Sequence, residues 1–398
     1  MRTSLNWSSR RAAGAFLLLA RPDDECDFRR PADYNMFNVL GWDIGGANVK
    51  AARIERDRPD TTIVRERPFA LWREPHRLST VLRETAEGLG STDRMASTMD
   101  RMAITMTAEL ADCFASKRDG VAFVLDQFHA AFPKLRPWVY GVDGRFRTLE
   151  AARLDPYAVA AANWMASATI ISRLVPDALF VDVGSTTTDV IAIVDGKVCV
   201  RGRTDPARLS SGELVYTGVL RTPICAIVKS LHLPDQRQCR VAAEHFAIAA
   251  DAYRWLGRID EHQYTCDTPD GRGRTREESA ARLSRMICAD YRRDRHAPTN
   301  EDSVLDAADV TAIAEQIMAA QVRLIASGIR QVRRRLGASA RPIIVLAGQG
   351  TFLGCEAANT AGLESRDLAS EIGIDAARAT PAYAVARLLA ESQEIDLT

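Results

Sequence analysis

Two segments of the chain combine glycines with side chains that can bind an anion or a metal. The first runs from Asp43 to Lys50 and holds Gly45, Gly46 and Asn48 between two apolar runs. Paired glycines let the backbone turn tightly, and the exposed N–H groups of such a turn can bind an anion. At the end of the preceding strand, the Asp43 carboxylate could bind Mg²⁺, and Lys50 adds a positive charge. An ordinary hairpin is the alternative for this segment taken alone.

The second segment repeats the pattern with hydroxyl groups. Asp182 ends an apolar strand, Asp189 begins the returning strand, and between them lie Gly184, Ser185, Thr186, Thr187 and Thr188. Hydroxyls donate hydrogen bonds to phosphate oxygens, and the two aspartates suit metal binding or proton transfer. Threonine is also common in strands, which leaves a plain hairpin as the alternative. A third glycine turn, at the end of a buried strand, is made of Gly348, Gln349 and Gly350.

These motifs lie on elements that occur twice. In each half, an apolar strand leads into the turn, and a returning strand and a third strand follow. The two aspartates, Asp43 and Asp182, are 139 residues apart, which indicates a duplicated domain rather than a short repeat. The sequence therefore predicts a first lobe over residues 36–175 and a second over 176–398, with their turns facing one cleft.

The second half is interrupted by a polar, helical insertion over about 205–300. A long helix is predicted to follow, beginning at Asp306 and ending near Gly337, because aspartate caps helix starts and glycine ends helices. Residues 1–35 hold one short apolar run among charged residues, which predicts a disordered extension; a signal peptide is the less favoured alternative.

The composition excludes several classes of protein. The 398 residues include 52 basic and 52 acidic side chains, so nothing favours nucleic acid as a partner. No apolar run reaches the roughly 20 residues that a membrane span needs. The eight cysteines form no C-x-x-C pair and the six histidines no close cluster, which argues against zinc and favours a cytoplasmic protein.

The three turns resemble the phosphate and adenosine motifs of the actin, sugar-kinase and Hsp70-ATPase superfold, a duplicated ribonuclease H-like α/β fold with two lobes. Longer segments resemble a narrower family, the hydantoinase/oxoprolinase-related proteins of tetrahydromethanopterin-linked C1 transfer, which are similar to archaeal methanofuran-biosynthesis synthases. These segments begin at Met106, Ser211, Arg221 and Asp270, and the resemblance spans about residues 36–391.

The resemblance implies a transferase. Its reaction joins an aminomethylfuran-methyl diphosphate to the phenol of γ-glutamyltyramine, forming an ether and releasing diphosphate, with Mg²⁺ as the expected cofactor. The partners are then small molecules, and homo-oligomerisation is left open. A base must accept the phenolic proton, and Glu109 and Asp112 are candidates, with Glu213 as a rival. Arg272 and Arg274, in a glycine-rich loop, could bind the diphosphate.

Each of these assignments has a plainer alternative. Glu109 and Asp112 could be charges at a helix start, and the two arginines could be solvated loop residues. Two other functions also use such a cleft: an ATP-dependent kinase, ATPase or amidohydrolase, and a non-catalytic nucleotide sensor. ATP turnover and diphosphate release distinguish these functions from the transferase.

Overall fold

The computed structural model describes residues 38–55, 58–90, 101–233, 237–292, 304–337 and 340–392, so the predicted extension over 1–35 lies outside the described residues. The first sheet has the strand order β3-β2-β1-β4-β5-β6. Its central strand, β1, is antiparallel to β2 and parallel to β4. The strands are β1 (Val39–Ile44), β2 (Asn48–Glu55), β3 (Arg58–Pro68), β4 (Arg101–Met106), β5 (Trp138–Tyr140) and β6 (Phe146–Arg147).

The second sheet repeats this arrangement. Its order is β10-β8-β7-β15-β16, with β9 also pairing with β8. The central strand, β7, is antiparallel to β8 and parallel to β15. The shared strand order confirms the predicted fold class, a duplicated ribonuclease H-like α/β fold. The strands are β7 (Ala178–Val183), β8 (Thr188–Val194), β9 (Lys197–Cys199), β10 (Leu214–Val215), β15 (Ile343–Ala347) and β16 (Ser365–Asp367).

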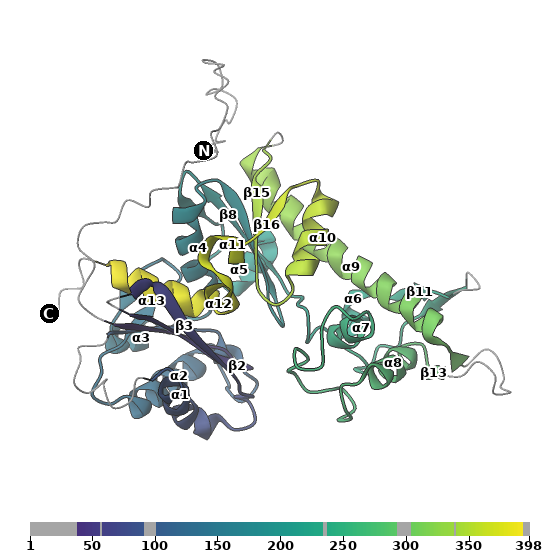
Figure 1. Cartoon of the computed structure of the whole chain (residues 1–398), viewed down its shortest axis with the longest axis horizontal. Coiled ribbons are helices and arrows are strands. Elements are labelled where there is room, and N and C mark those ends of the chain that lie inside the picture. Colours follow the sequence, from purple (N-terminus) through teal and green to yellow (C-terminus); the bar gives the residue numbers. More distant parts are fainter. Residues whose placement is uncertain are drawn as a thin grey trace, which may run out of the picture.

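Two helices join the lobes. The last helix, α13 (Thr380–Glu391), packs on β1, β2 and β4 of the first sheet, although it follows the second sheet in the chain (Figure 1). Helix α4 (Asn163–Leu174) packs on α13 and on β8 and β9. One hydrophobic core therefore contains side chains from both sheets, and the lobes exchange elements across the sequence boundary near residue 175.

Gly41 sets how closely α13 approaches the first sheet. A Cβ at this position would lie 2.0 Å from the carbonyl oxygen of Ala382 and 2.8 Å from the Cβ of Ala386. We expect Gly41→Ala to lower the free energy of unfolding by about 1–3 kcal/mol, because the helix backbone must move away. The control is Gly88→Ala, where the added carbon meets nothing nearer than 3.5 Å. Equal midpoints of thermal unfolding for the two variants would contradict this account.

The long helix follows the sequence prediction. Helix α9 (Ala307–Arg333) begins where Asp306 accepts hydrogen bonds from the N–H groups of Ala308 and Asp309. The turn between β8 and β9 places Asp195 and Gly196 at φ 49° and 70°, the left-handed values that an Asp-Gly hairpin favours. Helix α2 (Lys117–Ala131) begins after the cap Ser116, whose side chain accepts a hydrogen bond from the N–H group of Asp119.

The helical insertion lies beside the N-terminal part of α9 (Figure 1). It contains α7 (Ala249–Trp255) and α8 (Arg276–Arg285), which pack on one another and on α9. None of the helices in the described ranges is both long and apolar enough to cross a membrane. The remaining principal elements are α1 (Leu78–Glu87), α3 (Leu149–Leu154), α5 (Asp205–Ser211), α6 (Ile224–Ile227), β11 (Ser230–His232), β12 (Gln238–Arg240), β13 (Asp290–Tyr291), β14 (Val304–Leu305), α10 (Thr351–Ala361), α11 (Ala369–Ile372) and α12 (Ile374–Arg378).

Candidate active site

The two glycine turns have the same hairpin geometry. In the first, Asp43 pairs with Lys50, and the Gly45 N–H donates to the carbonyl of Asn48 at 2.9 Å. In the second, Asp182 pairs with Asp189, and the Gly184 N–H donates to the carbonyl of Thr187 at 2.9 Å. The duplicated strands therefore place a carboxylate at the mouth of each turn. The partner across the hairpin is a lysine in one turn and a second aspartate in the other.

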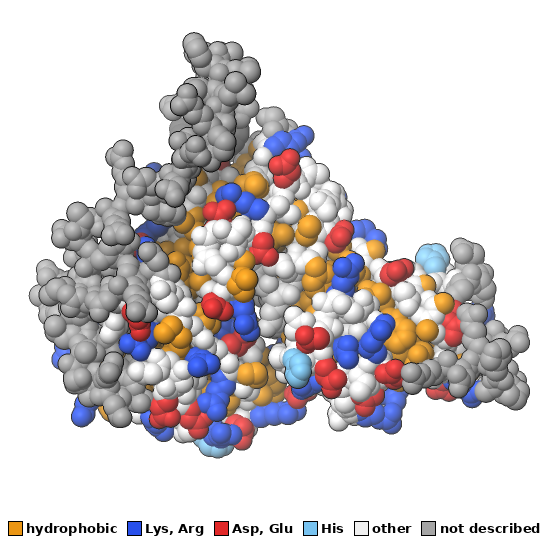
Figure 2. Space-filling model, viewed as in Figure 1, with side chains coloured by type: hydrophobic (Ala, Val, Ile, Leu, Met, Phe, Trp, Pro, Cys, Tyr) orange, Lys and Arg blue, Asp and Glu red, His pale blue; other side chains and the backbone are white. Residues whose placement is uncertain are grey.

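Both turns open onto one cleft of about 460 Å³ between the lobes. Residues singled out from the sequence contribute much of its wall. Those that line it are Asp43, Gly45, Gly46, Asn48, Lys50, Glu109, Asp112, Asp182, Gly184, Ser185, Thr186, Thr187, Asp189, Gly348 and Gln349. Outside the cleft, basic and acidic side chains are interspersed over the described surface of the face shown in Figure 2.

Burial dominates the electrostatics of the two turn carboxylates. It raises the pKa of Asp43 to about 6, against the opposing effect of Lys50, and one of its carboxylate oxygens is buried without a hydrogen-bond partner. Burial raises the pKa of Asp182 to about 7, and the charges of Asp189 and Asp43 add to this. A cation between the turns would relieve both effects.

Glu109 is the most deeply buried of the candidate bases that line the cleft. It lies in the short 3-10 turn η3 (Ala108–Leu110) that follows β4, and its side chain is 1% exposed. Burial raises its pKa to about 7, and its Oε2 is buried without a hydrogen-bond partner. Lys117 lies 3.9 Å from Oε1 and also pairs with Asp205. Asp112, by contrast, is exposed at the cleft.

Two glycines allow other segments to pack closely against Glu109 and Asp182. Helix α2 passes so close to η3 that a Cβ on Gly120 would lie 2.3 Å from the carbonyl oxygen of Glu109. The third turn approaches the second in the same way, because a Cβ on Gly348 would lie 2.3 Å from Oδ1 of Asp182. Gly348 also has φ 87°, which glycine adopts without strain.

Cationic side chains line the cleft as well. Lys50 lies 3.4 Å from Glu66 and donates to the carbonyl of Arg378 at 3.0 Å. Arg208 is buried, pairs with Asp189 at 2.7 Å and stacks on the Trp164 ring at 4.2 Å. Burial nevertheless raises the pKa of Asp189, with Arg208 acting in the opposite direction.

The structure does not bring every sequence candidate into the cleft. Glu213 is fully buried elsewhere and accepts hydrogen bonds from the N–H groups of Arg201 and Gly202 and from Arg335. These contacts make it a structural carboxylate. Two further candidates, Thr188 and Gly350, are absent from the cleft lining. The Thr188 hydroxyl donates to the carbonyl of Thr217, and Gly350 is the cap at the start of α10.

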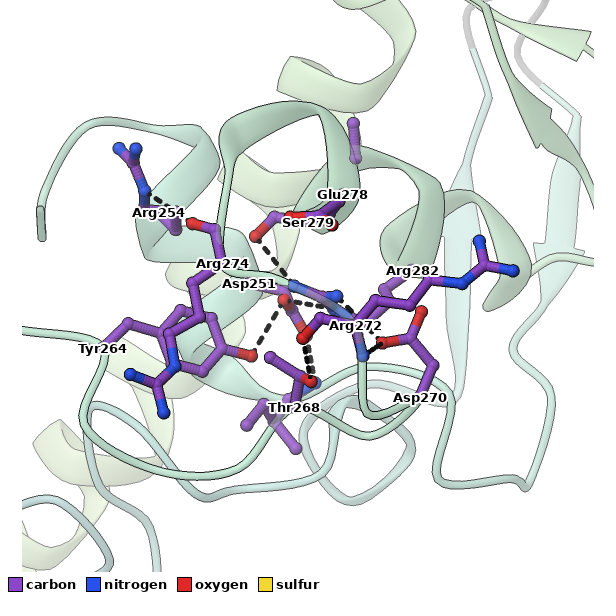
Figure 3. A network of polar contacts seen from close by, with 12 residues as sticks. Asp251, Arg254, Tyr264, Thr268, Asp270, Arg272, Arg274, Glu278, Ser279 and Arg282 are labelled. Atoms are coloured by element: carbon purple, nitrogen blue, oxygen red, sulfur yellow. Dashed lines mark hydrogen bonds and ion pairs between the residues drawn. The ribbon is translucent and has the colours of Figure 1, made fainter. Parts of the chain in front are cut away.

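Arg272 and Arg274 also lie outside the cleft lining. Their loop is organised by the fully buried Arg282, which binds Asp251 at 2.8 Å and Asp270 at 3.0 Å (Figure 3). Arg274 contributes its carbonyl to this network by accepting from Arg254, and its guanidinium lies 5.9 Å from the Tyr264 ring centre. The network fixes the loop within the insertion.

Comparison with known proteins places the chain in a family. The hydantoinase/oxoprolinase family model matches residues 100–392. The (4-{4-[2-(γ-L-glutamylamino)ethyl]phenoxymethyl}furan-2-yl)methanamine synthase of Methanocaldococcus jannaschii is 33% identical over 352 residues, covering 88% of this chain and 97% of that protein. The chain belongs to the hydantoinase/oxoprolinase family. The synthase of the same name from Methanococcus vannielii is 32% identical over 215 residues, covering 53% of this chain and 90% of that protein.

Solved structures share a lower sequence identity with this chain than the two synthases do. The ADPNP-bound activator of 2-hydroxyisocaproyl-CoA dehydratase from Clostridium difficile has a TM-score of 0.39 at 10% identity, covering 90% of this chain and 100% of its own. A ROK-family glucokinase from Streptomyces griseus has a TM-score of 0.40 at 11% identity, covering 86% of this chain and 98% of its own.

Several cleft residues of this family member were not singled out from the sequence. Leu110, Tyr216 and Arg221 lie in family-like segments of the sequence, but nothing in the residues themselves marked them as part of the site. Tertiary packing brings them to the cleft. They are Trp72, Leu110, Asp205, Arg208, Tyr216 and Arg221.

The donor set limits how a metal could be held. In the part of the chain that the structure describes, no three His, Cys, Asp or Glu side chains gather as a metal site. Asp43 and Asp182 could still hold Mg²⁺ together, because this ion takes few protein carboxylates and completes its shell with water and phosphate oxygens. The unpartnered oxygen of Asp43 fits such a role.

Proposed function

We propose that this protein is a transferase that joins an aminomethylfuran-methyl diphosphate to the phenol of γ-glutamyltyramine and releases diphosphate. One observation carries the proposal. A buried carboxylate, Glu109, lines the same cleft as two glycine turns suited to phosphate. The relatives named above support it, because their name describes a furan joined to a phenol through a phenoxymethyl ether.

The first step breaks the bond between the furylmethyl carbon and the diphosphate oxygen, and the electron pair leaves with the diphosphate. The furan ring stabilises the resulting cation by resonance, so catalysis depends chiefly on stabilising the departing anion. Backbone N–H groups of the two turns, the hydroxyls of Ser185 to Thr187 and the Lys50 ammonium supply donors and positive charge at the cleft. Mg²⁺ held by Asp43 and Asp182 would neutralise part of the diphosphate charge.

The second step forms the ether. The phenolic oxygen bonds to the furylmethyl carbon and its proton passes to the Glu109 carboxylate. A base with a pKa near the working pH serves this role well, and burial raises the pKa of Glu109 to about 7. Lys117, which also pairs with Asp205, places a positive charge 3.9 Å from Oε1 of the base.

The assay that tests this proposal contains no ATP. Purified protein is given the furan diphosphate, γ-glutamyltyramine and Mg²⁺, and both the ether and the released diphosphate are measured. We expect the two products in equal amounts. Absence of product together with rapid ATP hydrolysis by the same preparation would favour the kinase or ATPase alternative, which would use the Gly348 turn for the nucleotide.

A further inference from the structure

The outer part of the cleft is apolar. Leu110 is 52% exposed and Tyr216 is 56% exposed, and both line the cleft together with Trp72. These side chains come from η3, from the segment after β10 and from the segment after β3. Large exposed apolar side chains that converge on a polar cleft indicate contact with an apolar ligand group.

Hydrogen bonds fix this wall to the two glycine turns. The N–H groups of Phe69 and Leu71 donate to the carbonyls of Ala47 and Gly46, each at 2.9 Å. On the other lobe, Leu220 and Arg221 both donate to the carbonyl of Ser185 at 3.0 Å. Trp72 and Arg221 are therefore held at defined places relative to the turns.

Arg221 is a cleft cation without a carboxylate partner among the described residues. Its guanidinium lies 4.6 Å from the Trp72 ring centre, so the contact links the two lobes. The nearby carboxylate of the insertion loop, Asp267, is bound by Arg73 at 2.9 Å. An arginine placed on an aromatic face can still bind a carboxylate with its N–H fork.

The insertion loop lies next to this part of the cleft, because Arg73, the chain neighbour of Trp72, binds its Asp267. Burial raises the pKa of the Cys266 thiol to about 11, while the positive charges of Arg221 and Arg274 act in the opposite direction. The Arg282 network fixes this loop (Figure 3), and within it Arg282 is paired with Asp251 and Asp270. Trp72, Leu110, Tyr216 and Arg221 together form the part of the cleft that we call its mouth. It combines apolar side chains with one guanidinium group.

We propose that this mouth is the acceptor subsite, in which Trp72, Leu110 and Tyr216 hold the phenol ring and Arg221 binds the carboxylate of the glutamyl tail. The inference rests on the proposed function. Leu110 and Glu109 both line this cleft, so a ring packed on Leu110 shares the cleft with the base. The opposite end of the acceptor then reaches toward Arg221 and the insertion loop.

The test compares two acceptors, γ-glutamyltyramine and N-acetyltyramine, which lacks the carboxylate. We expect Arg221→Gln to raise the KM for γ-glutamyltyramine by roughly 10- to 100-fold, because a charged hydrogen bond is lost. The KM values for N-acetyltyramine and for the furan diphosphate should change little. Arg221→Lys should recover part of the loss. Tyr216→Ala should raise the KM for both acceptors alike.

The control is Arg258→Gln, an exposed arginine of the insertion outside this cleft. An Arg221→Gln enzyme that still prefers the carboxylate-bearing acceptor would overturn the proposal. A rise in the KM for the furan diphosphate alone would do so too, because Arg221 would then serve the diphosphate. Calorimetric titration of each acceptor in the presence of inorganic diphosphate tests the subsite without turnover. A wild-type protein that binds γ-glutamyltyramine preferentially but forms no ether would contradict the proposed reaction and leave the subsite supported.

Discussion

Replacing Glu109 with glutamine is expected to lower the turnover number by about 10²–10⁴, the range by which a positioned base accelerates a reaction. Glutamine keeps the shape of the side chain and cannot accept the phenolic proton. Binding of the furan diphosphate should persist, because Glu109 belongs to the wall that follows β4 rather than to either glycine turn. Steady-state kinetics and a binding titration separate these two effects.

The same variant should change the pH profile. Glu109 acts as a base only when ionised, and burial raises its pKa to about 7. In the wild-type protein kcat/KM should therefore rise about tenfold per pH unit below pH 7 and level off above it. For Glu109→Gln, kcat/KM should show no such rise below pH 7. It should instead increase toward pH 10, because the phenol itself ionises with a pKa of about 10. The assay is run at saturating Mg²⁺, which should keep Asp43 and Asp182 ionised over this range if they bind the ion as proposed.

Asp112→Asn is the matched control, because Asp112 lines the same cleft three residues away but is exposed. It should retain most of the activity and the wild-type pH profile. A large loss in Asp112→Asn with near-normal turnover in Glu109→Gln would transfer the role of base to Asp112. Equal unfolding midpoints for both variants are needed to exclude a folding defect.

Local sequence patterns were sufficient for the parts of the site that are built within one hairpin. Asp43 faces Lys50 and Asp182 faces Asp189 because a tight turn fixes the register of the two strands it joins. The turn at Gly348 reaches the cleft because β15 runs parallel to β7, which follows from the duplicated strand order.

Contacts between distant segments could not be predicted in this way. The sequence offers Glu213 as a candidate base, whereas in the folded chain Arg335, 122 residues later, binds it. Arg221 and Trp72 meet only after the two lobes have packed. The placement of α13 on the first sheet depends on Gly41, whose missing side chain is informative only when the helix above it is known.

Replacing Asp182 with asparagine is expected to lower turnover by about 10²–10³, the usual cost of removing one group that stabilises the charge of a transition state. Stability without ligand should not fall. Burial and the charges of Asp189 and Asp43 raise the pKa of Asp182 to about 7, so at pH 8 its ionised form is unfavourable in the folded protein. Asparagine removes that penalty and keeps the shape of the side chain.

The ligand response should distinguish this role from a purely structural one. Mg²⁺ with inorganic diphosphate should raise the unfolding temperature of the wild-type protein, because a ligand that binds only the folded state stabilises it. Asp182→Asn should lose most of that rise. The control is Asp195→Asn at the opposite end of β8, in the turn where φ is 49°, because asparagine also tolerates this conformation. It removes the same charge from the same sheet and should leave both the rise and the turnover intact. An Asp182→Asn protein that keeps the full stabilisation by Mg²⁺ and diphosphate would contradict the assignment of this carboxylate to the metal.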